Sequence, residues 1–136
     1  MDPIRRQLTD PQIERLLKVI NAIRVLDREM PGQVLATFLY VASHDDCHKP
    51  AMEQDLNFTT ASGSRNTDWL SKYHRLGKPG LDLIVKEPDP TNRRRTTLRL
   101  TPKGKQLIHH IKELLYGNQT PTIPRQETTE GNDQEL

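Results

Sequence analysis

The chain has 136 residues, a formal net charge of +2 and one cysteine, Cys47. This length gives room for one compact domain and a tail, because domains commonly contain about 100–150 residues, and a single cysteine excludes an internal disulfide. No apolar run approaches the roughly 20 residues of a membrane span, and the start of the chain is polar and interrupted by Pro3 and Pro11, unlike a secretory signal. We therefore expect a soluble cytoplasmic protein with no membrane association.

The first predicted helix begins at Pro11, with Thr9 or Asp10 as its N-cap, and runs to about Arg28. Proline is tolerated at the first helical position, where its missing N–H costs nothing. Apolar residues recur at three- and four-residue steps and cover more than one face of this helix. One such face lines the core of a small domain. We assign the remainder to a second protomer, and burial within the monomer is the alternative.

A second helix is predicted from about Gln33 to Ser43, after the break at Met30-Pro31-Gly32. A polar loop at residues 44–49 follows, and a short helix, Ala51–Leu56, then starts after Pro50. The expected core stripe of the second helix is Val34, Leu35, Phe38, Leu39 and Ala42.

The turn at residues 57–60 predicts the N-cap of a further helix, which we expect to end by His74 or Arg75, ahead of Gly77. Small polar side chains are unusually frequent in this helix up to Asp68. Its expected inward contacts are Leu70 and Tyr73, with Trp69 at the edge.

A β-hairpin is predicted next, because Leu81, Leu83 and Val85 alternate as in a strand after the turn signal Lys78-Pro79-Gly80. A polar tip at residues 87–92 joins this strand to a second one, Arg95–Leu100. The last helix follows Thr101 as N-cap, with Pro102 at its first position. Its apolar face consists of Leu107, Ile108, Ile111, Leu114 and Leu115.

The order of these elements is that of a winged helix-turn-helix domain, so the predicted fold class is mainly α with a small β-hairpin. We expect this domain to occupy residues 1–116 and residues 117–136 to form a disordered acidic tail, since they have almost no apolar content. The first and last helices are expected to form a homodimer interface from Leu16, Val19, Ile20, Ile23, Ile108, Ile111 and Leu115.

The positive charge of the chain is concentrated in its middle. Residues 60–112 hold 12 basic and 4 acidic residues, a net charge of +8, whereas residues 1–59 have a net charge of −2 and residues 113–136 one of −4. A concentrated positive segment attracts a polyanion and releases its counterions, so nucleic acid is the leading class of partner. An ordinary solvated basic surface is the alternative.

The polar helix after residue 60 has the composition of a helix that reads the major groove of double-stranded DNA. Arg65 is the best candidate for a bidentate contact with guanine, and Asn66 could pair with adenine if it faces outward. A weakly amphipathic surface helix is the alternative. The predicted DNA-binding residues of this region are Thr60, Ser62, Ser64, Arg65, Asn66, Asp68 and Lys72, and those of the hairpin are Asn92, Arg93, Arg94 and Arg95.

The three consecutive arginines after Asn92 are the stronger signal, because they repel one another unless an anion lies nearby. In strand geometry alternate side chains point to opposite faces, so Arg93 and Arg95 are expected on one side, with Arg94 on the other side or flexible. Phosphate contact and minor-groove insertion are both open to them, and a solvated charge run is the alternative.

Four stretches together resemble the winged-helix signature of the MarR family of transcriptional regulators: residues 55–59, Asp68-Trp69-Leu70, residues 88–94, and Leu98 to Gly104. The resemblance covers roughly Gln33 to Leu115. It implies a dimer that binds palindromic DNA through Ser62, Ser64, Arg65, Arg93 and Arg94. The family usually ends in two long dimerisation helices, whereas this sequence predicts one, and we expect no small-molecule effector because a buried pocket is hard to place.

Other chemistry has little support in the sequence. The cluster at residues 44–48 holds histidine, aspartate and cysteine, but adjacent residues rarely converge on one ion, so we expect a polar loop and no metal. No glycine-rich phosphate loop or nucleophile with an evident base is present, so we expect no enzyme activity, catalytic residue or cofactor. The rival function is a winged helix that docks to a polymerase or replication factor as a protein-interaction module.

Overall fold

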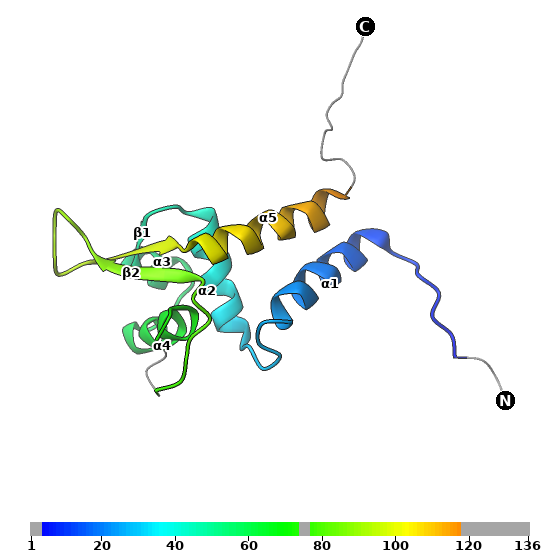
Figure 1. Cartoon of the computed structure of the whole chain (residues 1–136), viewed down its shortest axis with the longest axis horizontal. Coiled ribbons are helices and arrows are strands. Elements are labelled where there is room, and N and C mark those ends of the chain that lie inside the picture. The colour runs from blue at the N-terminus through cyan, green and yellow to red at the C-terminus, as the bar shows by residue number, and fades with distance from the viewer. Residues whose placement is uncertain (1–3, 74–76, 118–136) are drawn as a thin grey trace, which may run out of the picture. The chain divides into compact units, whose positions relative to one another are not determined.

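A computed structural model describes residues 4–73 and 77–117 of the chain. The described chain divides into two compact units, one spanning Leu26–Ile108 and the other combining residues 4–25 with residues 109–117. The predicted tail lies outside the described residues apart from Gly117. The elements in chain order are α1 (Pro11–Arg24), α2 (Gly32–Ser43), β1 (Cys47–His48), α3 (Lys49–Asp55), α4 (Thr60–Leu70), β2 (Ile84–Pro88), β3 (Thr96–Leu100) and α5 (Pro102–Tyr116) (Figure 1).

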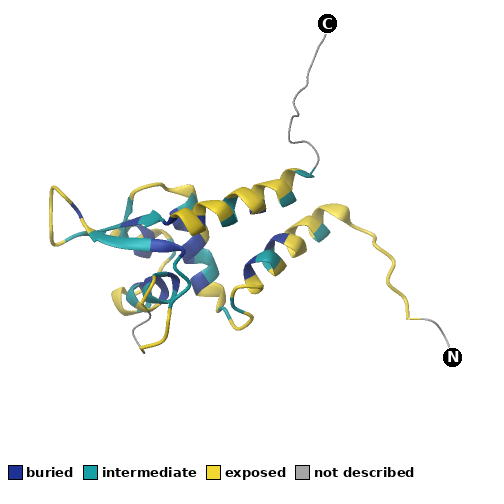
Figure 2. Cartoon of the chain, in the orientation of Figure 1, coloured by how far each residue is buried: buried dark blue, intermediate teal, exposed yellow. Residues whose placement is uncertain are grey.

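The core of the unit spanning Leu26–Ile108 lies where α2, α4 and the sheet meet (Figure 2). Val34 and Phe38 of α2 are fully buried, as predicted, but Leu39 is 38% exposed and was assigned to the core wrongly. Thr37 and Val41 are buried in its place, because the inward face follows steps of three and four residues from Val34. The other fully buried side chains of this core are Met52, Leu70, Leu83, Ile84 and Leu98.

The sheet has three antiparallel strands in the order β1-β3-β2, so β3 is central. The predicted hairpin is confirmed as β2 and β3, but the predicted polar loop contains β1, in which Cys47 pairs with Leu98 and His48 with Thr97. Strand β2 begins at Ile84, later than predicted. The residues before it are held instead by the end of α4, since the backbone N–H of Leu83 donates to the carbonyl of Leu70 at 2.8 Å.

Two helices end earlier than predicted. Helix α1 starts with Asp10 as N-cap, one of the two residues predicted for this position, but it stops at Arg24. Asp27 beyond it accepts hydrogen bonds from the backbone N–H of Glu29 at 3.0 Å and from Nε1 of Trp69 at 2.6 Å. Such side-chain bonds favour a turn over a further helical turn.

Helix α4 ends at Leu70, and His74 and Arg75, where its end was predicted, lie outside the described residues. The Ser71 hydroxyl donates to the carbonyl of Thr67 at 2.6 Å and closes the last turn. Leu70 is fully buried, as predicted, whereas Tyr73 is 77% exposed and makes no inward contact of the kind expected.

The other unit contains α1 and the last part of α5, which are joined by a hydrogen bond from Nη1 of Arg15 to the carbonyl of Leu115 at 3.5 Å. Among the described helices, none is both long and apolar enough to cross a membrane. Of the residues predicted for dimerisation, Leu16 and Leu115 are exposed, Ile20 and Ile108 are half-buried, and Val19, Ile23 and Ile111 are buried within the single chain.

Candidate nucleic-acid interface

A tight turn between α3 and α4 positions the polar helix. Asn57 adopts a positive φ of 60°, a conformation that asparagine tolerates better than most residues, and the backbone N–H of Phe58 donates to the carbonyl of Glu53 at 2.8 Å. The hydroxyl of Thr59 caps α4 by accepting from the backbone N–H of Ser62 at 3.1 Å. These local bonds hold the connection between α3 and α4 and the start of α4.

The side chain of Glu53 on α3 packs against Gly63 of α4. A Cβ at this position would lie 2.1 Å from Oε2 of Glu53, and the Glu53 side chain is buried and paired with Lys49. Glycine at this position leaves the room that the Glu53 side chain occupies between the two helices, although it costs helix stability. Sequence reasoning missed the roles of Glu53 and Lys49, since the packing of α3 on α4 has no local signature.

The outer face of α4 carries part of the predicted set. Thr60 and Arg65 are exposed, while Ser62 and Ser64 are half-buried. Arg65 donates from Nη2 to the Ser62 hydroxyl at 3.0 Å, which holds its guanidinium along the helix surface. Lys72, just beyond the helix, is exposed, with its ammonium 5.7 Å from the centroid of the Tyr73 ring.

Two predicted readers of DNA depart from the prediction. Asn66 is 6% exposed and its amide points to Gln33, with Nδ2 3.5 Å from Oε1, so it does not face outward as a contact with adenine requires. Asp68 forms an ion pair with Lys86 of β2 and so joins α4 to the sheet. Burial and pairing of polar groups depend on tertiary neighbours, which the helical pattern alone does not reveal.

The connection between β2 and β3, which we call the wing turn, comprises residues 89–95. The backbone N–H of Asp89 donates to the carbonyl of Arg95 at 2.8 Å, and the backbone N–H of Arg94 donates to the Asn92 side chain at 3.2 Å. Arg93 and Arg94 lie in this turn and not in a strand, since β3 begins at Thr96, so the expected alternation of the arginines does not apply.

The three arginines of the wing turn differ in their surroundings. Arg93 and Arg94 are exposed, and their guanidinium groups make no hydrogen bond or ion pair with another described residue. Arg95 instead donates from Nε to the Asp89 carboxylate at 3.2 Å. Two uncompensated positive charges thus lie side by side at the end of the hairpin, and the third is bound internally.

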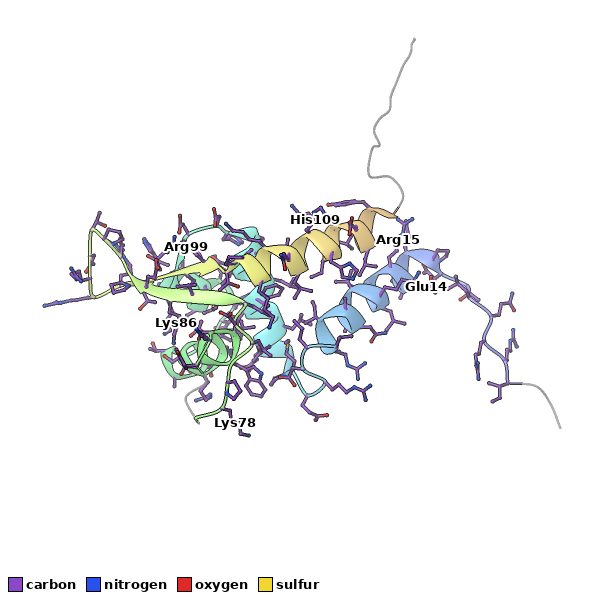
Figure 3. The ribbon with its side chains drawn as sticks, viewed as in Figure 1. Glu14, Arg15, Lys78, Lys86, Arg99 and His109 are labelled. Atoms are coloured by element: carbon purple, nitrogen blue, oxygen red, sulfur yellow. The ribbon has the colours of Figure 1, made fainter. Side chains whose placement is uncertain are left out.

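A hollow of about 300 Å³ separates α4 from the wing turn. Ser64 of α4 and Arg93 of the wing turn both border it, so the two elements are open to the same side of this unit. Figure 3 shows Lys86 reaching from β2 into the space beside α4. The residues that line the hollow are Lys49, Ser64, Lys86, Glu87, Pro88, Arg93 and Thr96.

Asp89 is a further residue that sequence reasoning missed. Its carboxylate is buried in the wing turn, and the backbone N–H of Thr91, with the Thr91 hydroxyl and Arg95, holds the pKa of Asp89 below its usual value despite the opposing effect of burial. The Pro-Asp-Pro sequence is a turn signal from which an Asx-type bond could have been expected. Among the described residues, no three histidine, cysteine or acidic side chains are grouped as a metal ion requires.

The helices and the three-stranded sheet define a winged helix-turn-helix protein. The fold is of the MarR type. No protein-family model matches the sequence, and no curated protein is significantly similar to it.

Solved structures with the same fold are similar to this chain at low sequence identity. The Staphylococcus aureus MepR–DNA complex has a TM-score of 0.62 and 17% identity, over 79% of this chain and 81% of that chain. A MarR transcriptional regulator from Methanosarcina mazei has a TM-score of 0.56 and 14% identity, over 76% and 68%. The repressor CouR bound to a 23-mer DNA duplex has a TM-score of 0.55 and 19% identity, over 78% and 68%.

Proposed function

We propose that the chain is a sequence-specific double-stranded-DNA-binding protein that regulates transcription as a dimer. The observation that carries the proposal is the common hollow bordered by Ser64 of α4 and Arg93 of the wing turn. A major groove about 12 Å wide admits one helix, and a hairpin beside that helix then reaches the neighbouring backbone. MepR and CouR, which have the same fold, were solved with DNA.

In this proposal α4 supplies the contacts with base edges. Arg65 is exposed and held along the helix by Ser62, an arrangement that suits a bidentate contact with guanine. Thr60, Ser62 and Ser64 supply shorter hydrogen-bonding groups, and Lys72 supplies a phosphate contact. Asn66 and Asp68 are left out, because their side chains are engaged with Gln33 and Lys86.

The wing turn supplies sequence-independent attraction. Arg93 and Arg94 have no acidic partner among the described residues, so phosphates can bind them without first displacing a carboxylate. Asn92 lies at the same turn. Arg95 contributes chiefly by its bond to Asp89.

The dimer in this proposal is built from the exposed apolar side chains of α1 and the end of α5. Leu16 is 53% exposed and Leu115 is 37% exposed. Ile20 and Ile108 are half-buried and extend this set, whereas Val19, Ile23 and Ile111 support it from within the chain. A two-fold dimer presents two copies of α4 to a palindromic site. The proposal includes no enzyme activity and no small-molecule effector.

Selection of bound sites from random duplexes, followed by affinity measurements at rising salt, tests the proposal. We expect a palindromic site and an affinity that falls steeply with salt. Arg65→Ala should reduce the preference for that site over random duplex by about 1–3 kcal/mol, and Lys105→Ala on exposed α5 is the matched control. The absence of salt-dependent duplex binding would contradict the proposal and favour the protein-interaction module.

A further inference from the structure

The Asp89 carboxylate is the point at which the wing turn is held together. Oδ1 accepts hydrogen bonds from the backbone N–H and the hydroxyl of Thr91, both at 3.1 Å. Oδ2 lies 3.2 Å from Nε of Arg95 and 3.0 Å from Nε2 of His48. The side chain of Asp89 is only 8% exposed, so a buried charge is satisfied here by four polar contacts.

These partners come from different places in the fold. Thr91 and Arg95 flank the two exposed arginines of the wing turn, so the carboxylate closes the turn from both sides. His48 belongs to β1, which pairs with β3 but is outside the hairpin. The same carboxylate therefore ties the turn to the edge of the sheet.

The negative charge of Asp89 opposes the binding of an anion at the wing turn. A carboxylate beside Arg93, Arg94 and Arg95 lowers the positive potential that would attract a phosphate. An uncharged residue at this position would favour anion binding by charge alone. Electrostatic attraction of DNA thus does not explain a carboxylate at this position, whereas its four polar contacts within the fold do.

We propose that Asp89 is the positioning residue of the wing. It holds Arg93 and Arg94 in the arrangement that meets DNA phosphates, and His48 anchors that arrangement to β1. The inference rests on the proposed function, because it concerns how the wing turn engages the duplex.

The substitution Asp89→Asn separates positioning from charge. It removes one negative charge from the wing, so a purely electrostatic role predicts tighter duplex binding. A positioning role predicts the opposite, namely weaker duplex binding and a shallower fall of affinity with salt. About one or two phosphate contacts would be lost, and each contributes about 0.9 to the slope of log affinity against log salt. If the substitution only destabilised the fold, the fraction of protein able to bind the duplex would fall, but the slope of log affinity against log salt would not change.

Glu87→Gln is the matched control, since Glu87 lies on β2 and pairs with Arg99 but its side chain makes no hydrogen bond or ion pair with the described residues of the wing turn. It removes the same charge, and we expect equal or tighter binding with an unchanged slope. His48→Ala is the second variant. His48 is partly exposed, so the loss of its contact should weaken duplex binding only about two- to fivefold.

Backbone order parameters of the free protein test the positioning without DNA. In Asp89→Asn those of Arg93 and Arg94 should fall from about 0.85 toward 0.6, while those of α4 stay constant. Unchanged order parameters, or a salt slope equal to that of the wild type, would overturn the inference. Failure of the wild type to bind any duplex would instead mark the failure of the proposed function, and the inference would fall with it.

Discussion

Removal of the two exposed wing arginines is the sharpest test of the phosphate contacts. The double substitution Arg93→Ala and Arg94→Ala deletes two guanidinium groups that have no partner among the described residues, so it disrupts no internal bond. Each phosphate contact contributes about 0.9 to the slope of log affinity against log salt, so we expect the slope to fall by about 1.8. Between 50 and 200 mM salt, the wild type should then lose about 12-fold more affinity than the variant.

Fluorescence anisotropy with a labelled duplex at four or five salt concentrations measures both slopes. Arg99→Ala is the control, because Arg99 lies on β3 and its charge is compensated by Glu87 and by Asp46, whose Oδ1 is 3.4 Å from Nε. We expect its slope to match that of the wild type. Parallel lines for the wild type and the double variant would refute the assignment of Arg93 and Arg94 to phosphates.

Three further predictions concern stability and assembly. Leu98→Ala should lower the free energy of unfolding in urea by about 2–5 kcal/mol, because Leu98 is fully buried on the central strand, and a loss below about 1 kcal/mol would contradict that placement. Leu16→Glu should reduce the mass measured by light scattering from twice 15.7 kDa to 15.7 kDa, and a wild type that is monomeric at high concentration would remove the dimer. Because the pKa of Asp89 is lowered on folding, its contribution to stability is present above about pH 4 and is lost on further acidification. In thermal melts, the melting temperature of Asp89→Asn should therefore fall less on acidification than that of the wild type. Equal decreases in melting temperature would count against the bonded carboxylate.

Local signals predicted the helix starts well. The N-cap of α1 was expected at Thr9 or Asp10 and that of α5 at Thr101. Asp10 caps α1, and the hydroxyl of Thr101 caps α5 by accepting from the backbone N–H of Gly104 at 3.0 Å. A cap depends on residues within one helical turn, so its signature lies in the sequence itself. The ends of α1 and α4 were predicted less well, because they depend on bonds to distant residues, such as that between Asp27 and Trp69.

Pairings between distant segments were beyond sequence reasoning. Strand β1 consists of two residues that pair with β3 about fifty positions later, and a two-residue strand has no periodicity to detect. The states of the charged residues were equally hidden. Asp68 and Arg95 were both predicted to contact DNA, but they form ion pairs with Lys86 and Asp89 in the folded chain. The sequence shows which residues are basic or acidic, but the tertiary structure decides which of them remain available to contact DNA.

Cleavage of DNA by a reagent attached to the protein tests most directly whether α4 and the wing turn engage one duplex. An iron-chelate reagent would be placed at Ala61→Cys on α4 or at Pro90→Cys in the wing turn, both exposed, with the native Cys47 replaced by serine. We predict that both positions cut the selected duplex, at centres about five base pairs apart, since adjacent major and minor grooves are half a helical turn apart. Cutting from only one of the two positions would contradict the account.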